Sequence, residues 1–315
     1  NFDMPKASQA EAEDGKNDDK FMTPLKTKYE INYQTEFGDG SDGDVTISSP
    51  VTLTRDMFYN NLTVNSTLTT DGYKIYVKGT ISGSGIITWG VANNGGNSGS
   101  GSSGFGVGGA ASGSGLFKNG AGGDGGKNWP SESGTGKSVS LEHSIGVIGG
   151  SGGSSGHPGG ASTVSKLIPI TTFRIGAVFG MDILINSSGL TYYPYTASGG
   201  GGGGGSSGNA TYYAGGGGGG AGGGLVWIAA KIWAGTFEIK ALGGNGGNGY
   251  YNGTLGGGGG GGGGGGVAVI IYAKKTWTGA YNLAGGVGGV GPGSANDGAN
   301  GSTGVYYEIL LHKLL

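Results

Sequence analysis

Short apolar stretches alternate with stretches of pure glycine along much of this chain. The clearest apolar stretches, Leu225–Ala230 and Val267–Tyr272, are continuous and have the length of buried strands. Glycine runs surround them at Gly199–Gly205, Gly215–Gly220 and Gly256–Gly266. A flexible linker would mix its glycine with serine and would contain no strands. We therefore expect the glycine runs to be ordered and to form part of the fold.

Residues 38–94 show a different pattern, in which β-branched and polar residues alternate over short distances. Turn signals such as Asp71-Gly72 separate the apolar stretches. The predicted strands are Val45–Ile47, Val51–Thr54, Leu62–Val64, Tyr73–Lys78 and Ile86–Trp89. Their regular spacing predicts a small β-sandwich or β-solenoid module.

Residues 1–37 contain little glycine and much of the acidic charge, and they carry helix signals. Ser8 and Glu11 have the spacing of a capping box, and Pro24 suits the first turn of a second helix. These signals predict two short helices, Ser8–Asp14 and Pro24–Ile31, with too little apolar surface to fold alone. The chain is thus expected to be mainly β, with a helical connector (1–37), a β-module (38–94) and a Gly-rich body (95–315).

The Gly-rich body contains a weak internal repeat. Gly222–Gly244 and Gly266–Gly286 each consist of a glycine run, an apolar strand, a lysine-containing turn, a second strand and more glycine. We align Lys231 of the first unit with Lys274 of the second. Repeats of this kind stack to share one core.

Composition excludes several classes of protein. Glycine supplies 82 of 315 residues, but with 8 prolines and contiguous glycine runs the chain is not collagen. A formal net charge of −2 with 12% charged residues gives no basic stripe for nucleic acid. The chain contains no run of 18 apolar residues, which is the length that would predict a membrane-spanning helix. It contains no cysteine, so disulfides and thiolate metal sites are excluded.

Polyglycine can be ordered as a left-handed threefold helix similar to polyproline II, which rises about 3.1 Å per residue. Such a helix makes no internal hydrogen bonds, so its N–H and C=O groups must bond to neighbouring helices. At that rise Gly256–Gly266 would span about 34 Å and Gly199–Gly205 about 22 Å. We expect several such polyglycine II helices to pack side by side, which offsets the large entropy that glycine loses on folding.

Two segments resemble parts of tailed-bacteriophage tail-fibre proteins. The first comprises the pattern Ala7-Ser8-Gln9-Ala10-Glu11-Ala12-Glu13 with Gly15, followed by Lys20–Thr27, and it resembles a connector between fibre modules that is usually trimeric. The second comprises Gly38–Asp44 and Tyr59–Val64 and resembles a module that precedes Gly-rich bodies in phage structural proteins. Residues 95–315 resemble in architecture the polyglycine-sandwich adhesin at the tip of T-even-like phage long tail fibres, although fusion to a connector departs from that family.

The resemblance implies a virion tail-fibre protein that is made in the host cytoplasm and mediates non-covalent attachment to a bacterial outer-membrane protein or polysaccharide. Its other partners would be fibre subunits, and the chain would be a homotrimer. Aromatic residues beside the glycine runs are the candidate receptor-binding residues, because exposed tyrosine gives rigid contact area at low entropic cost. They are Tyr192, Tyr193, Tyr195, Tyr212, Tyr213, Tyr250, Tyr251 and Trp129. The alternative is that these aromatic residues cap the ends of the packed helices.

Nothing in the sequence indicates an enzyme or a cofactor. The carboxylates of the Gly-rich body are scattered, whereas a glycosidase needs a facing pair. The three histidines lack the spacing of zinc ligands. Asp39, Asp42 and Asp44 have oxygen ligands for calcium but no acidic closing residue, and we expect a turn there. A shaft segment without a receptor and a surface-polysaccharide depolymerase remain alternatives, and ice binding is a weaker one because no threonine ladder accompanies the glycine.

Overall fold

The computed structural model describes residues 36–99, 104–115, 117, 119–126, 135–136, 139–141, 149–154, 159–164, 183–186, 189–192 and 214–311. This part of the chain consists of strands and extended segments with almost no helix, which confirms the expectation of a mainly β protein. The helices expected within residues 1–37 lie outside it.

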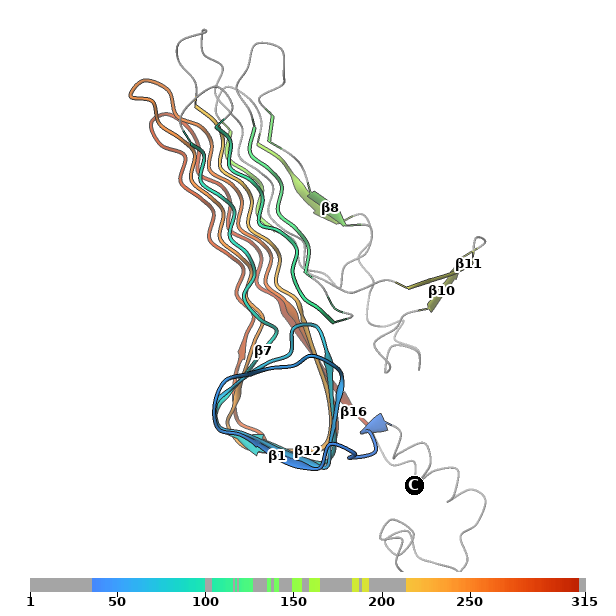
Figure 1. Ribbon diagram of the computed structural model, residues 1–315. Coiled ribbons are helices and arrows are strands. Elements are labelled where there is room, and N and C mark those ends of the chain that lie inside the picture. Colours follow the sequence, from blue (N-terminus) through green and yellow to red (C-terminus); the bar gives the residue numbers. More distant parts are fainter. Residues whose placement is uncertain are drawn as a thin grey trace, which may run out of the picture.

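Two parallel sheets face each other in the lower part of the molecule (Figure 1). The larger sheet has the order β1 (Asp44–Ile47), β4 (Asn61–Val64), β6 (Lys74–Gly83), β12 (Leu225–Trp233), β14 (Val267–Lys275) and β16 (Val305–Leu310), with β3 (Met57–Tyr59) also beside β6. The smaller sheet has the order β2 (Val51–Thr52), β5 (Thr67–Thr69), β7 (Ile86–Thr88), β13 (Glu238–Lys240) and β15 (Tyr281–Asn282). The chain alternates between the sheets as it advances, so the topology is that of a β-solenoid rather than an antiparallel sandwich.

Two further strand pairs lie apart from these sheets. β8 (Val139–Leu141) and β9 (Ser162–Val164) pair in parallel, and β10 (Ile183–Asn186) and β11 (Gly189–Tyr192) form an antiparallel pair.

One hydrophobic core fills the space between the two sheets. Leu62 and Ile81 enter it from the larger sheet and Leu68 and Ile87 from the smaller one, and all four are fully buried. Strands from residues 38–94 and from residues 214–311 therefore share this core. A second buried cluster, which includes Trp227, covers the opposite face of the larger sheet.

The internal repeat corresponds to successive coils of the solenoid. β12 pairs with β14 so that Leu225 lies opposite Val267 and Ile232 lies opposite Lys274. The alignment of Lys231 with Lys274 is therefore wrong by one position. The error arose because a strand pattern with lysines near its end does not fix the register to a single residue.

Extended Gly-rich segments leave the sheets and run side by side away from them (Figure 1). We call these segments the Gly-rich bundle. Its described members are 91–98, 105–110, 120–126, 149–154, 214–224, 241–250, 256–266, 283–291 and 295–304. Segments 214–224, 256–266 and 295–304 lead directly into β12, β14 and β16, while 241–250 and 283–291 follow soon after β13 and β15.

Hydrogen bonds between the segments of the bundle repeat every three residues. Within 256–266, the amides of residues 257, 260 and 263 donate to the carbonyls of 250, 247 and 244 at 2.8–2.9 Å. The amides of 259, 262 and 265 donate to 296, 299 and 302, and the carbonyls of 258, 261 and 264 accept from 217, 220 and 223. Three successive residues thus bond to three different neighbours, which satisfies the backbone groups without side chains.

Glycine is required at most positions where such a segment is surrounded, although Ala214 and Ala221 are fully buried in segment 214–224. A Cβ on Gly260 would lie 2.0 Å from the carbonyl oxygen of Gly218, and one on Gly217 would lie 1.9 Å from that of Gly247. Segments 214–224 and 256–266 are buried along their whole length, whereas 241–249 repeats a buried, an exposed and a partly exposed residue. The sequence of 241–249 follows that period, because its exposed positions are Leu242, Asn245 and Asn248.

Candidate binding site at the end of the Gly-rich bundle

Two turns lie close together at the end of the bundle that is remote from the sheets (Figure 1). Residues 250–256 join segment 241–250 to segment 256–266, and residues 291–295 join segment 283–291 to segment 295–304. Both turns are anchored, because Tyr250 N–H donates to Gly215 O at 3.1 Å and Gly249 N–H donates to Val290 O at 2.9 Å. Whatever side chains these turns carry are therefore held by the backbone lattice beneath them.

Within the first turn, Asn252 fixes the backbone. Its Oδ1 accepts from the N–H groups of Thr254 at 2.9 Å and Leu255 at 2.7 Å, and its own N–H donates to Leu255 O at 3.1 Å. An asparagine that bonds to the backbone two and three residues ahead is a common means of closing a turn. The loop is consequently a defined structure.

Tyr251 is the most exposed aromatic residue of this turn, with 47% of its surface accessible. Its hydroxyl donates to Gly253 O at 3.0 Å. Its ring covers Gly293 of the neighbouring turn, where a Cβ would lie 2.8 Å from the ring. Gly293 also has a φ of +70°, so a side chain there would be strained as well as crowded. Tyr251 therefore packs against the second turn and still leaves about half of its surface accessible to solvent.

The structure brings together only part of the predicted aromatic set. Tyr250 and Tyr251 lie in the turn just described. The backbone of Tyr192 ends β11, where it pairs with Ile183. The remaining candidates lie outside the described residues, and they are Trp129, Tyr193, Tyr195, Tyr212 and Tyr213.

Sequence reasoning did not include the turn 291–295 or Gly293 in the site. The available signal was the internal repeat, because extending it places Gly293 at the position that Tyr251 occupies in the preceding unit. Glycine without an aromatic neighbour gave no reason to select it.

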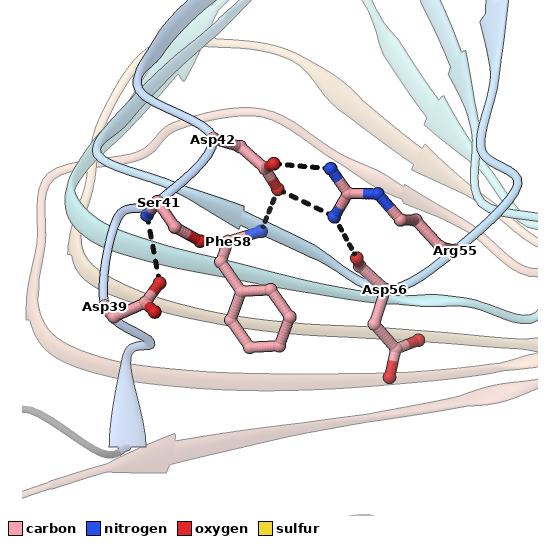
Figure 2. Close-up of polar contacts among 6 residues, drawn as sticks. All are labelled: Asp39, Ser41, Asp42, Arg55, Asp56 and Phe58. Carbon is pink, nitrogen blue, oxygen red and sulfur yellow. Dashed lines mark hydrogen bonds and ion pairs between the residues drawn. The ribbon is translucent and has the colours of Figure 1, made fainter.

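The acidic segment at the start of the solenoid is a turn in which its carboxylates bind to different partners (Figure 2). Asp42 pairs with Arg55 at 2.5 Å and accepts from Phe58 N–H at 2.7 Å, while Asp39 accepts from Ser41 N–H at 2.9 Å. The bond from Arg55 lowers the pKa of Asp42 below its usual value.

Asp44, the third carboxylate of that segment, accepts from the side-chain amides of Asn60 at 2.7 Å and Asn61 at 2.9 Å. Among the described residues, no group of three histidine, aspartate or glutamate side chains could hold a metal ion.

A polar cluster covers the open end of the solenoid core beside β16. Tyr281 O–H donates to Glu308 Oε1 at 2.7 Å, and Lys275 forms an ion pair with the same carboxylate. The ring of Tyr281 stacks on that of Tyr306, with centroids 4.2 Å apart. Burial and the bond to Glu308 raise the pKa of Tyr281 well above its ordinary value. These contacts finish the last coil and belong to the fold rather than to the site at the other end of the molecule.

Comparison with protein-family models, curated proteins and solved structures gives no significant match for this chain. In the described part of the chain there is no helix that is long and apolar enough to span a membrane.

Proposed function

We propose that this chain is the receptor-binding protein of a bacteriophage tail fibre, a non-enzymatic adhesin of the virion. The connector in residues 1–37 would join it to other fibre subunits as a homotrimer. The solenoid would carry the Gly-rich bundle, and the bundle would hold the turns against a bacterial outer-membrane protein or polysaccharide.

A finer proposal concerns the bundle itself, whose segments we infer to be packed polyglycine II helices. The support is the three-residue period of their hydrogen bonds, since a threefold helix directs successive residues to three neighbours. The position of the missing Cβ supports it as well. At Gly260 and Gly217 that position points at a carbonyl oxygen, which suits a weak Cα–H···O contact.

The observation that carries the functional proposal is the pair of anchored turns at the end of a bundle whose interior is almost entirely glycine. A rigid frame that presents short loops with an exposed tyrosine is the arrangement used by many binding loops. Asp42 is engaged by Arg55, and Asp44 by the side-chain amides of Asn60 and Asn61. A surface-polysaccharide depolymerase remains the alternative.

The test is binding of the fluorescently labelled full chain to a panel of bacterial strains. We expect at least one strain to be labelled, and Tyr250→Ser with Tyr251→Ser to reduce that labelling at least tenfold. Tyr306→Ser is the matched control, because Tyr306 is 54% exposed but lies in β16 among the sheets. Labelling of no strain, or equal labelling by the double variant, would contradict the proposal. Release of reducing sugar from the cells would favour the depolymerase instead.

A further inference from the structure

One face of the Gly-rich bundle carries a regular array of exposed side chains. It is formed by three neighbouring segments. Segments 241–250 and 283–291 expose every third residue, and segment 91–98 exposes those in line with them as well as Asn93 and Gly96. We call it the Asn–Val face, and its residues are Val91, Asn94, Asn97, Leu242, Asn245, Asn248, Ala284, Val287 and Val290. None of the nine is charged, and the valines are 87%, 60% and 53% exposed at positions 91, 287 and 290.

Backbone hydrogen bonds hold the three segments of this face in register. Gly95 N–H donates to Asn245 O and Gly246 N–H donates to Val287 O, both at 2.8 Å. One triplet further along, Ser98 N–H and Gly249 N–H repeat these bonds with Asn248 O and Val290 O at 2.9 Å. The exposed side chains therefore form rows across the segments, which recur about every 9 Å along them if each residue rises about 3.1 Å.

The four asparagines of the face have fixed orientations. Oδ1 of Asn94 accepts from Asn245 N–H at 2.8 Å, and Oδ1 of Asn245 accepts from Val287 N–H at 2.9 Å. Asn97 and Asn248 repeat the same two bonds in the next row, both at 2.8 Å. Because each partner is a backbone N–H, the atom that faces it is the carbonyl oxygen of the amide, so the NH₂ group occupies the other side.

Each of the two rows that contain asparagines thus presents two positioned amide donors beside a valine, whereas the row of Val91, Leu242 and Ala284 is apolar. The Nδ2 groups of these four asparagines make no hydrogen bond with the described residues. Their orientation is already set by the lattice, so a ligand that accepts from them loses little side-chain entropy on binding.

We propose that the Asn–Val face binds a neutral polysaccharide. Hydroxyl and ring oxygens of the sugar accept from the Nδ2 groups, and the apolar C–H surface of the sugar packs on the valines. A repeating polymer engages successive rows, so weak contacts add up through multivalency. The face lacks a cation for an anionic ligand. A second copy of the chain fits poorly, because a twofold interface would set the same donors against each other.

The face consists of other residues than the turns, although its last row, Asn248 and Val290, adjoins them. Its test uses purified polymers rather than cells, so the proposal can fail independently of the proposed function. The test uses the purified full chain and immobilised dextran, mannan, galactan and amylose, with hyaluronate as an acidic comparison. We expect at least one neutral polymer to bind more tightly than hyaluronate. Asn245→Asp combined with Asn248→Asp keeps the acceptors for Val287 and Val290 but removes two of the four amide donors. It should weaken that binding at least tenfold with an unchanged melting temperature.

Asn300→Asp is the matched control, because Asn300 Oδ1 also accepts from a backbone N–H, that of Gly288 at 2.9 Å, but lies outside the face. It should bind like the wild type. If the double variant unfolds, Val290→Lys tests the same face without touching an amide, and should weaken binding similarly. Binding of no neutral polymer, or unchanged binding by a folded variant of the face, would overturn the proposal. So would a dimer in sedimentation that the same variants abolish, since a second copy would then cover the face.

Discussion

Replacing Gly260 by alanine should destabilise the protein far more than one added methyl group normally does. The new Cβ would lie 2.0 Å from Gly218 O, whereas real Cβ contacts below 3.0 Å essentially never occur. The segments must therefore move apart. That movement weakens the bonds from Gly260 N–H to Gly247 O at 2.9 Å and from Gly289 N–H to Gly260 O at 2.7 Å.

The magnitude follows from two costs and one gain. Overpacking a well-packed interior costs about 1–3 kcal/mol, and each buried backbone group left without its partner costs about 1–3 kcal/mol. The lower conformational entropy of unfolded alanine returns only about 0.4–1 kcal/mol. With mid-range values the net loss is about 3 kcal/mol, which corresponds to a melting temperature lower by roughly 6–12 °C for a domain of this size.

The assay is differential scanning calorimetry of Gly260→Ala beside Gly99→Ala. Gly99 is the matched control, because a Cβ there would meet no atom within 4 Å. Its variant should melt within a few degrees of the wild type, since only the small entropic term remains. If Gly260→Ala melts as the control does, segment 256–266 is not packed against its neighbours and the account of the bundle is wrong.

Three further predictions concern the polar contacts. Asn245→Ala should lower the free energy of unfolding by at most about 1 kcal/mol, because the N–H of Val287, which loses its acceptor, can donate to water instead. Urea unfolding of this variant beside Asn245→Asp would measure the difference. The pKa of Asp42 is lowered by Arg55, so this pair contributes to the free energy of unfolding above about pH 4. The contribution is lost as the pH falls through the pKa of Asp42 in the native protein. Asp42→Asn should therefore make the free energy of unfolding less dependent on pH on the acid side, which unfolding curves at several pH values would measure. The pKa of Tyr281 is raised by burial and by Glu308, so its contribution is complete below about pH 10 and is lost as the pH rises above that. Burial also raises the pKa of Tyr59 and Tyr76 to about 12 and that of Tyr307, so several tyrosines should resist ionisation near pH 10 in the native protein. In a spectrophotometric titration, Tyr281→Phe should lower the number of resistant tyrosines by one relative to the wild type.

The strands could be predicted from the sequence because their apolar side chains must be buried, and this fixes where each strand lies and which face it buries. The expected strands around Leu62, Ile86 and Val267 correspond to β4, β7 and β14, since burial of β-branched and aromatic residues decides both their type and their facing. β3 and β5 were missed, because Met57–Tyr59 has no polar residue to mark an alternation and Thr67–Thr69 has a single apolar residue between two threonines.

The arrangement of the Gly-rich segments could not be predicted in the same way. A residue without a side chain has no preference among neighbours, so nothing in Gly256–Gly266 specifies its contacts with 214–224 or 241–250. Those contacts follow from the strands at the segment ends, which set the direction and register. The triplet pattern around Asn245 and Asn248 does contain a signal, because a side chain at every third residue marks the face that no neighbour covers.

The direct passage from bundle to sheet also has a mechanical consequence. Segments 214–224, 256–266 and 295–304 enter their strands without an intervening turn, and the hydrogen bonds between segments are lateral. A pull along the bundle, applied at the turn 250–256, would load these bonds in shear and would reach β14 through the chain itself. Hydrogen bonds loaded in shear must break together rather than one after another. The bundle should therefore transmit tension to the solenoid core with little extension, unlike a flexible linker.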